Sequence, residues 1–154
     1  MKPLKTAQRG VGLIENLVAM LVLLIGLLGM AGLVLHVMRQ AGRSEYESQA
    51  ANAAQMVLGA AFAQAAGGSA VLQGLNGVTT ANTGNVQGAL LQALQEWAGY
   101  TQAALPPGST GSLQVTAPGG GACSALPCVL TVTMNWSDHD RQAESYVVSQ
   151  VMGY

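Results

Sequence analysis

The residue with the clearest chemical consequence is Glu15, a carboxylate at the leading edge of a long apolar run. The 23 residues that follow it, from Asn16 to Met38, contain no Lys, Arg, Asp or Glu. A carboxylate at membrane depth costs about 2.5–3.5 kcal/mol on insertion scales, and less near the interface, so such a residue usually has a partner. Because the next cation along the chain is Arg39, the sequence predicts that Glu15 finds its partner on another molecule.

Other side chains that could carry chemistry are few. Cys123 and Cys128 enclose four residues and have no third or fourth ligand nearby, so a disulfide is favoured over the alternative of a shared metal ion. Asp138 and Asp140 could hold a calcium ion, but they lack EF-hand spacing and are interpreted as turn residues. No Ser or Cys stands in a recognised nucleophile context beside either histidine. The sequence therefore predicts no catalytic site, no metal and no cofactor.

Composition and charge narrow the class of protein. Of the 154 residues, 50% are hydrophobic and only 8% are charged, which excludes classical disorder. Six Lys and Arg against seven Asp and Glu give a net charge of −1, without the basic surface that binding to nucleic acid requires. The length suits one domain with a sizeable core.

The uncharged run has the length of a membrane span. As a helix it extends about 35 Å, against a hydrocarbon core of about 30 Å. Lys2, Lys5 and Arg9 precede it without any acidic residue among them, which predicts a cytoplasmic N-terminus and a head on the outer side. The alternatives are an uncleaved membrane anchor and a secretory signal cut near Gly29-Met30-Ala31.

Helical periodicity continues beyond the span. Apolar residues recur every three or four positions, with Leu58 and Phe62 alongside them and polar residues on the other face. These residues are Tyr46, Ala50, Ala53, Val57, Ala61 and Ala65. The pattern predicts one helix from about Gly12 to about Ala66, ended by Gly67-Gly68. Its first half is apolar on all sides, and its second half is amphipathic.

The rest of the chain predicts a small head. Residues 69–84 are rich in Gly, Thr and Asn, which is typical of a surface loop. A second helix is predicted over 85–100, where Val86, Leu90, Leu94 and Trp97 have helical spacing. Alternating residues predict strands near 113–115, over 128–136 and over 143–152. The expected fold class is α+β, with a long N-terminal transmembrane and amphipathic helix packed on a small antiparallel sheet of three or four strands.

The run Gln8-Arg9-Gly10-Val11-Gly12-Leu13-Ile14-Glu15 resembles the N-terminal signal of type IV pilins and pseudopilins. In that family a basic leader ends in Gly, and the fifth residue of the mature chain is Glu; Gly10 and Glu15 occupy those positions. The resemblance implies that a prepilin peptidase cuts between Gly10 and Val11 and methylates the new amine of Val11. It also implies that Glu15 pairs with the N-terminal amine of a neighbouring subunit. Val11 departs from the Phe that most members carry.

The resemblance also implies how the chain is divided. Residues 1–10 would be the cleaved leader, 11–38 the membrane and filament-core half of the stem helix, 39–66 its amphipathic half, and 67–154 the globular head. Gly32 stands where major pilins usually carry Pro, and the strand that ends at Trp136 follows a Cys. Both features are similar to minor pilins of the PilV type.

The implied function is that of a minor pilin, which helps to prime assembly of a type IV pilus and forms part of its tip complex, in adhesion and twitching motility. The implied partners are the prepilin peptidase, other minor pilins, the major pilin and the bacterial inner membrane before assembly, with a tip adhesin as a further candidate. The head would be periplasmic and later lie at the cell surface. Two alternatives stay open, a pseudopilin of a type II secretion system and a bitopic membrane protein with a ligand-binding head.

Overall fold

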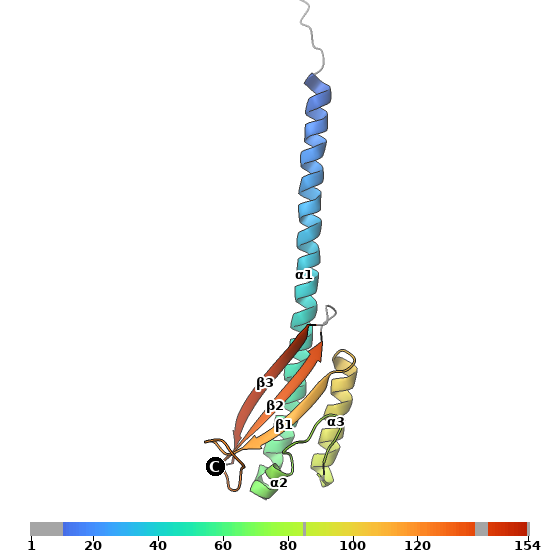
Figure 1. Cartoon of the computed structure of the whole chain (residues 1–154). Coiled ribbons are helices and arrows are strands. Elements are labelled where there is room, and N and C mark those ends of the chain that lie inside the picture. Colours follow the sequence, from blue (N-terminus) through green and yellow to red (C-terminus); the bar gives the residue numbers. More distant parts are fainter. Residues whose placement is uncertain (1–10, 85, 138–141, 154) are drawn as a thin grey trace, which may run out of the picture. The chain divides into compact units, whose positions relative to one another are not determined.

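A computed structural model of the chain describes residues 11–84, 86–137 and 142–153 (Figure 1). The fold is α+β, with a long N-terminal helix and a three-stranded antiparallel sheet, as predicted. The elements are α1 (Val11–Gln64), a 3-10 turn (Ala65–Gly67), α2 (Ser69–Gln73), α3 (Gly88–Ala104), β1 (Thr110–Thr116), β2 (Cys128–Ser137) and β3 (Ala143–Met152). The chain divides into two units, residues 1–42 and 43–154, and each is described by itself.

The described part of the first unit is the first half of α1, and its large apolar side chains are uncovered from Leu13 onward. The large apolar residues from Leu13 to Met38 are each between 49% and 74% exposed. By length and composition this helix can cross a membrane. A Cβ atom added at Gly26, Gly29 or Gly32 would meet nothing within 4 Å, so no contact within the chain requires these glycines. The apolar surface needs lipid or other helices to cover it.

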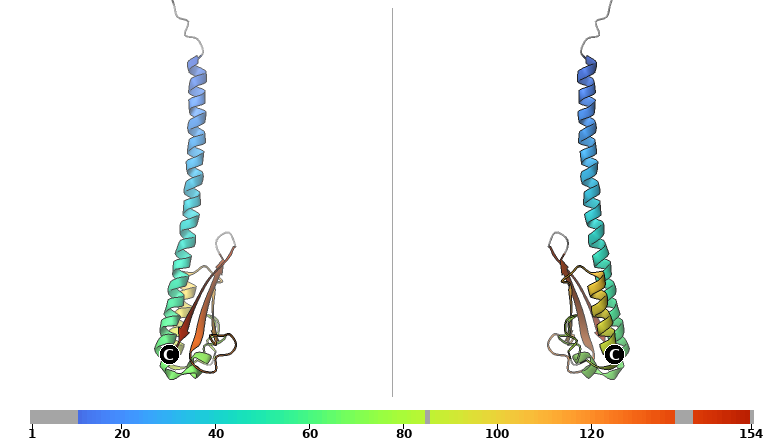
Figure 2. Two further views of the ribbon diagram at one scale, coloured as in Figure 1. Left: turned by 90° about the vertical axis from the view of Figure 1, so that its left-hand side faces the viewer. Right: turned by 90° about the vertical axis from the view of Figure 1, so that its right-hand side faces the viewer.

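In the second unit, the second half of α1 and α3 lie on the same face of the sheet (Figures 1 and 2). The predicted stripe on α1 is buried from Ala50 to Ala65, and Tyr46 packs against it in a partly buried position. Phe62 was expected alongside this stripe, but that expectation is wrong, since its side chain is 51% exposed. Phe62 lies one helical turn beyond the buried Leu58 on the same side of α1, so the buried surface on that side of the helix ends before Phe62.

The sheet has the order β1-β2-β3, with both pairs antiparallel. One row across it joins Leu113 to Val132 and Val132 to Val148, and these residues face the helices. Alternate residues of β2 are buried, as the sequence pattern predicted. They are Leu130, Val132, Met134 and Trp136. The core lies between this face and the two helices, and Trp97 of α3 is wholly buried in it.

The segment 69–84 was predicted to be a surface loop, and this is wrong. It contains α2, and Leu72, Leu75 and Val78 are at most 1% exposed. Their spacing of three residues brings apolar side chains repeatedly to the core, a signal hidden by the surrounding Gly, Thr and Asn. The segment also bonds to β1, since Gly77 N donates to the Leu113 carbonyl at 3.0 Å. These residues therefore complete the core and cover one edge of the sheet.

Close packing at Gly111 gives a stability prediction. A Cβ atom there would overlap the ring of Trp97 and lie 3.0 Å from Met134 Sδ. We expect Gly111→Ala to destabilise the 43–154 unit by about 1–3 kcal/mol, the usual cost of overpacking a core. Gly99→Ala is the matched control, because its Cβ would meet nothing and the residue is exposed within α3; it should stabilise the unit by up to about 1 kcal/mol. Denaturant unfolding measures both, and equal effects would contradict the packing argument.

Candidate processing and assembly site

The residues singled out for processing lie at the start of α1. Gly10 is outside the described residues, and α1 begins at Val11. Glu15 follows Val11 by four positions, which places the two on the same face of the helix, about 6 Å apart along its axis. The structure thus puts the carboxylate one helical turn beyond the expected new N-terminus.

Glu15 is exposed, and it makes no hydrogen bond or ion pair with any residue that the structure describes. The first described cation after it is Arg39, about 36 Å further along the helix axis at 1.5 Å per residue. Its neighbours Leu13, Ile14 and Leu17 are exposed apolar side chains. A carboxylate in this setting is suited to pair with a cation of another chain, and that pairing stays a prediction.

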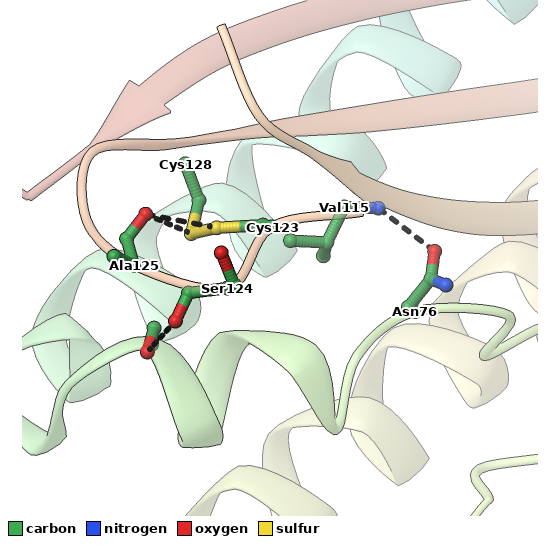
Figure 3. Close-up of a disulfide and its surroundings, with 7 residues drawn as sticks. Asn76, Val115, Cys123, Ser124, Ala125 and Cys128 are labelled. Atoms are coloured by element: carbon green, nitrogen blue, oxygen red, sulfur yellow. Dashed lines mark hydrogen bonds between the residues drawn. A yellow bond between two sulfur atoms is a disulfide. The ribbon is translucent and has the colours of Figure 1, made fainter. Parts of the chain in front are cut away.

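A second feature of interest is the loop before β2, where Cys123 and Cys128 form a disulfide (Figure 3). Their Cα atoms are 5.7 Å apart, within the usual range for a disulfide. Both sulfur atoms lie close to the Ala125 carbonyl oxygen, at 3.4 and 3.8 Å. With both sulfurs in the bond, neither is a thiolate ligand. Among the described residues no group of three His, Cys, Asp or Glu could hold a metal ion.

Hydrogen bonds tie this end of the head to the segment that follows α1. Ser69 Oγ donates to the Ser124 carbonyl at 3.3 Å, and Val115 N donates to Asn76 Oδ1 at 3.0 Å (Figure 3). The disulfide closes a loop of six residues directly before β2, so it fixes how the chain enters the central strand.

Removing the disulfide is expected to destabilise the head. A loop of this length restricts the unfolded chain by about 2 kcal/mol in the chain-entropy account. The double variant Cys123→Ala with Cys128→Ala should lower the free energy of unfolding of the 43–154 unit by about that amount. Denaturant unfolding under oxidising conditions measures it. An unchanged free energy of unfolding would contradict this chain-entropy account of the disulfide.

The structure also shows a contact that sequence reasoning missed. Arg43 on α1 forms an ion pair with Glu144 at the start of β3, with the two side chains 50% and 31% exposed. The residues are 101 positions apart, and no local pattern connects them. The pair links the amphipathic half of α1 to β3. Asp138 and Asp140, interpreted from the sequence as turn residues with calcium binding as the alternative, lie outside the described residues.

Comparison with known proteins bears on the N-terminal segment. Residues 5–31 match a family model described as the prokaryotic N-terminal methylation motif. The match includes Gly10, Val11 and Glu15 and extends through the exposed apolar helix as far as Ala31. Neither the curated proteins nor the solved structures give a match to the chain.

Proposed function

Because this chain carries the N-terminal methylation motif of type IV pilin-like proteins, we propose that it is a minor pilin of the PilV type. In this role it helps to prime assembly of a type IV pilus and forms part of the tip complex, in adhesion and twitching motility. The observation that carries the proposal is the first half of α1, whose large apolar side chains from Leu13 to Met38 are uncovered and which holds a single carboxylate, Glu15. Such a helix suits a subunit that passes from lipid into a bundle of like helices.

The chemistry of assembly begins with hydrolysis of the amide between Gly10 and Val11 by the prepilin peptidase. The product is a free amine on Val11. The same enzyme transfers a methyl group to this amine from a sulfonium methyl donor, which leaves as the thioether, and the methylated amine remains cationic. In the assembled bundle this amine pairs with Glu15 of a neighbouring subunit. An amine and a carboxylate buried together cost much less than either charge buried alone, so the pair selects the register in which two helices pack.

The basic N-terminal residues and the disulfide support a location in the inner membrane with the head in the periplasm. Lys2, Lys5 and Arg9 favour retention of the N-terminus on the cytoplasmic side of the inner membrane. The head would then lie in the periplasm, an oxidising compartment in which a disulfide such as that of Cys123 and Cys128 persists. The proposed partners are the prepilin peptidase, other minor pilins, the major pilin and a tip adhesin.

Two features favour a minor over a major pilin. Major pilins usually carry Pro where this chain has Gly32, and they tend to close a long C-terminal loop with their disulfide. Here the disulfide closes a short loop before β2, and β3 follows it without any further cysteine. A pseudopilin of a type II secretion system shares the leader and the stem helix and is the second candidate.

Deletion of the gene separates the candidates. We expect a deletion strain of the source bacterium to lose surface pili and twitching while it still secretes folded exoproteins, and the wild-type gene to restore both pili and motility. Loss of exoprotein secretion with normal pili would favour the pseudopilin. If pili, motility and secretion were all unchanged, the chain would belong to neither machine and the proposal would fail.

A further inference from the structure

The two edges of the sheet differ in how their backbone groups are used. The edge at β1 is closed by residues 76–80. Leu113 N donates to the Val78 carbonyl at 2.8 Å, and Thr80 N donates to the Gly111 carbonyl at 3.0 Å. At the other edge, no described residue outside β2 forms a backbone hydrogen bond with Ala143–Met152. This edge, on β3, is open.

The register identifies which groups of β3 are free. Gly111 and Leu113 direct their N–H and C=O groups to residues 76–80, so Ser112 between them must direct its own groups to Thr133 of β2. Directions alternate along a strand, so Val132 of β2 faces β3 and bonds to Val148. The odd-numbered residues of β3 therefore point their backbone groups to the open edge. They are Ser145, Val147, Ser149 and Val151.

The open edge lacks the features that keep edge strands apart. Isolated edges are usually blunted by Lys, Pro, a bulge or a very short strand. β3 instead pairs with β2 over its full ten residues and contains no Lys or Pro. Its one charged side chain, Glu144, pairs with Arg43. Val147 and Val151 are each 57% exposed, and Ser145 and Ser149 are exposed and uncharged.

We propose that the β3 edge receives an extended, uncharged segment of a different subunit of the assembly, which adds to the sheet as a fourth strand. A row of alternating N–H and C=O groups is matched only by the backbone of another extended chain. The small, uncharged side chains at the four positions neither repel nor obstruct such a segment. Strand addition would leave the helix-covered core unchanged.

The geometry of the sheet disfavours a second copy of this chain as the occupant. The β1 edge of a copy is closed, so the copy could offer only its own β3. Antiparallel pairing of two β3 edges turns one sheet by half a turn in its plane, and the second halves of α1 would then run in opposite directions. Two chains anchored in one membrane do not present their heads in this way. The exclusion of a second copy rests on the proposed function, whereas the observation of an open edge does not.

The test uses the full-length protein, expressed in the source bacterium after its chromosomal gene for this protein has been deleted. A photo-crosslinking amino acid replaces Ser149 at the open edge or, as the control position, Gln114 on β1. Val147→Pro removes one edge N–H and leaves the hydrogen bonds to β2 in place, because proline is tolerated at the free side of an edge strand. Val147→Thr keeps the N–H and the branched shape and changes only the methyl group.

The expected result is an adduct from position 149, and not from 114, to a second protein that carries an N-terminal methylation motif. Val147→Pro should lower its yield by about tenfold or more, and Val147→Thr should change it by less than about twofold. Ser145→Pro provides the same test near the end of the strand if Val147→Pro fails to accumulate. Three results would overturn the proposal. They are an equal loss of adduct yield in Val147→Pro and Val147→Thr, an adduct that joins two copies of this chain, and the absence of any adduct from a chain that has been cleaved after Gly10. An uncleaved chain would instead overturn the proposed function.

Discussion

Replacing Glu15 with Ala should leave the protein in the membrane but lower its incorporation into the surface assembly by about 100-fold or more. Insertion is unharmed because the change removes a charge from an apolar helix. Assembly fails because the N-terminal amine of the neighbouring subunit is buried without a partner, and breaking a buried ion pair in this way costs about 3–5 kcal/mol. The ratio of protein in sheared surface filaments to protein in membranes measures the effect.

Asn16→Ala is the matched control for this experiment. It removes a polar group from the adjacent position of the same exposed helix, but it leaves the carboxylate in place. Glu15→Asp should restore part of the incorporation, because it keeps the charge on a shorter side chain. If the Glu15→Ala protein reached the surface fraction at the wild-type ratio, the proposed pairing with the amine would be wrong.

The second large effect concerns solubility. A chain that begins near Gly42 should be soluble and monomeric without detergent, whereas the full-length protein should require detergent. The buried core runs from Ala50 to Met152 and lies entirely within the second unit. The exposed apolar side chains of Leu13 to Met38 are absent from the shorter chain. Size-exclusion chromatography in detergent-free buffer measures the difference.

Aggregation of the shorter chain would be the contrary outcome. If it aggregated as strongly as the full-length protein, the head would depend on the first half of α1 for its fold. A chain that begins at Val11 serves as the control, because it lacks the leader but keeps the whole apolar helix, and it should need detergent. The boundary near Gly42 is thereby tested separately from the loss of residues 1–10.

Much of the fold could be predicted because the relevant signals are local. The α1 stripe and the alternation in β2 follow directly from periods of 3.6 and 2 residues. The strand predicted over residues 143–152 coincides with β3, and the one predicted over 128–136 differs from β2 by one residue. Helix α3 extends from Gly88 to Ala104, later than predicted, because its first turn has no side-chain cap that would mark it in the sequence.

The failures have a common physical origin in long-range contacts. Leu72 and Leu75 belong to a core that includes residues of α1 and of the sheet, and a composition rich in Gly and Thr concealed this. Gly111 must be glycine because Trp97, distant in sequence, fills the space above it. The ion pair of Arg43 and Glu144 likewise joins residues brought together only by the fold.

The N-terminal motif and the β3 edge also differ in how far the sequence alone predicts them. The sequence around Gly10 and Glu15 is a short linear motif that matches the N-terminal methylation model, so its residues alone are enough to recognise it. The open edge of β3 has no such local signature, because it depends on strand order and on the closure of β1 by residues 76–80. The proposed processing signal is therefore visible in the local sequence, whereas the proposed docking edge is a property of the folded head.

The most direct test of the central claim is the N-terminus of the protein isolated from membranes of cells with an active prepilin peptidase. Intact mass and terminal sequencing should show a chain that begins at Val11, lacks residues 1–10 and carries a methylated N-terminal amine. A chain that still begins at Met1, or one cut after Ala31 so that it begins at Gly32, would contradict the account.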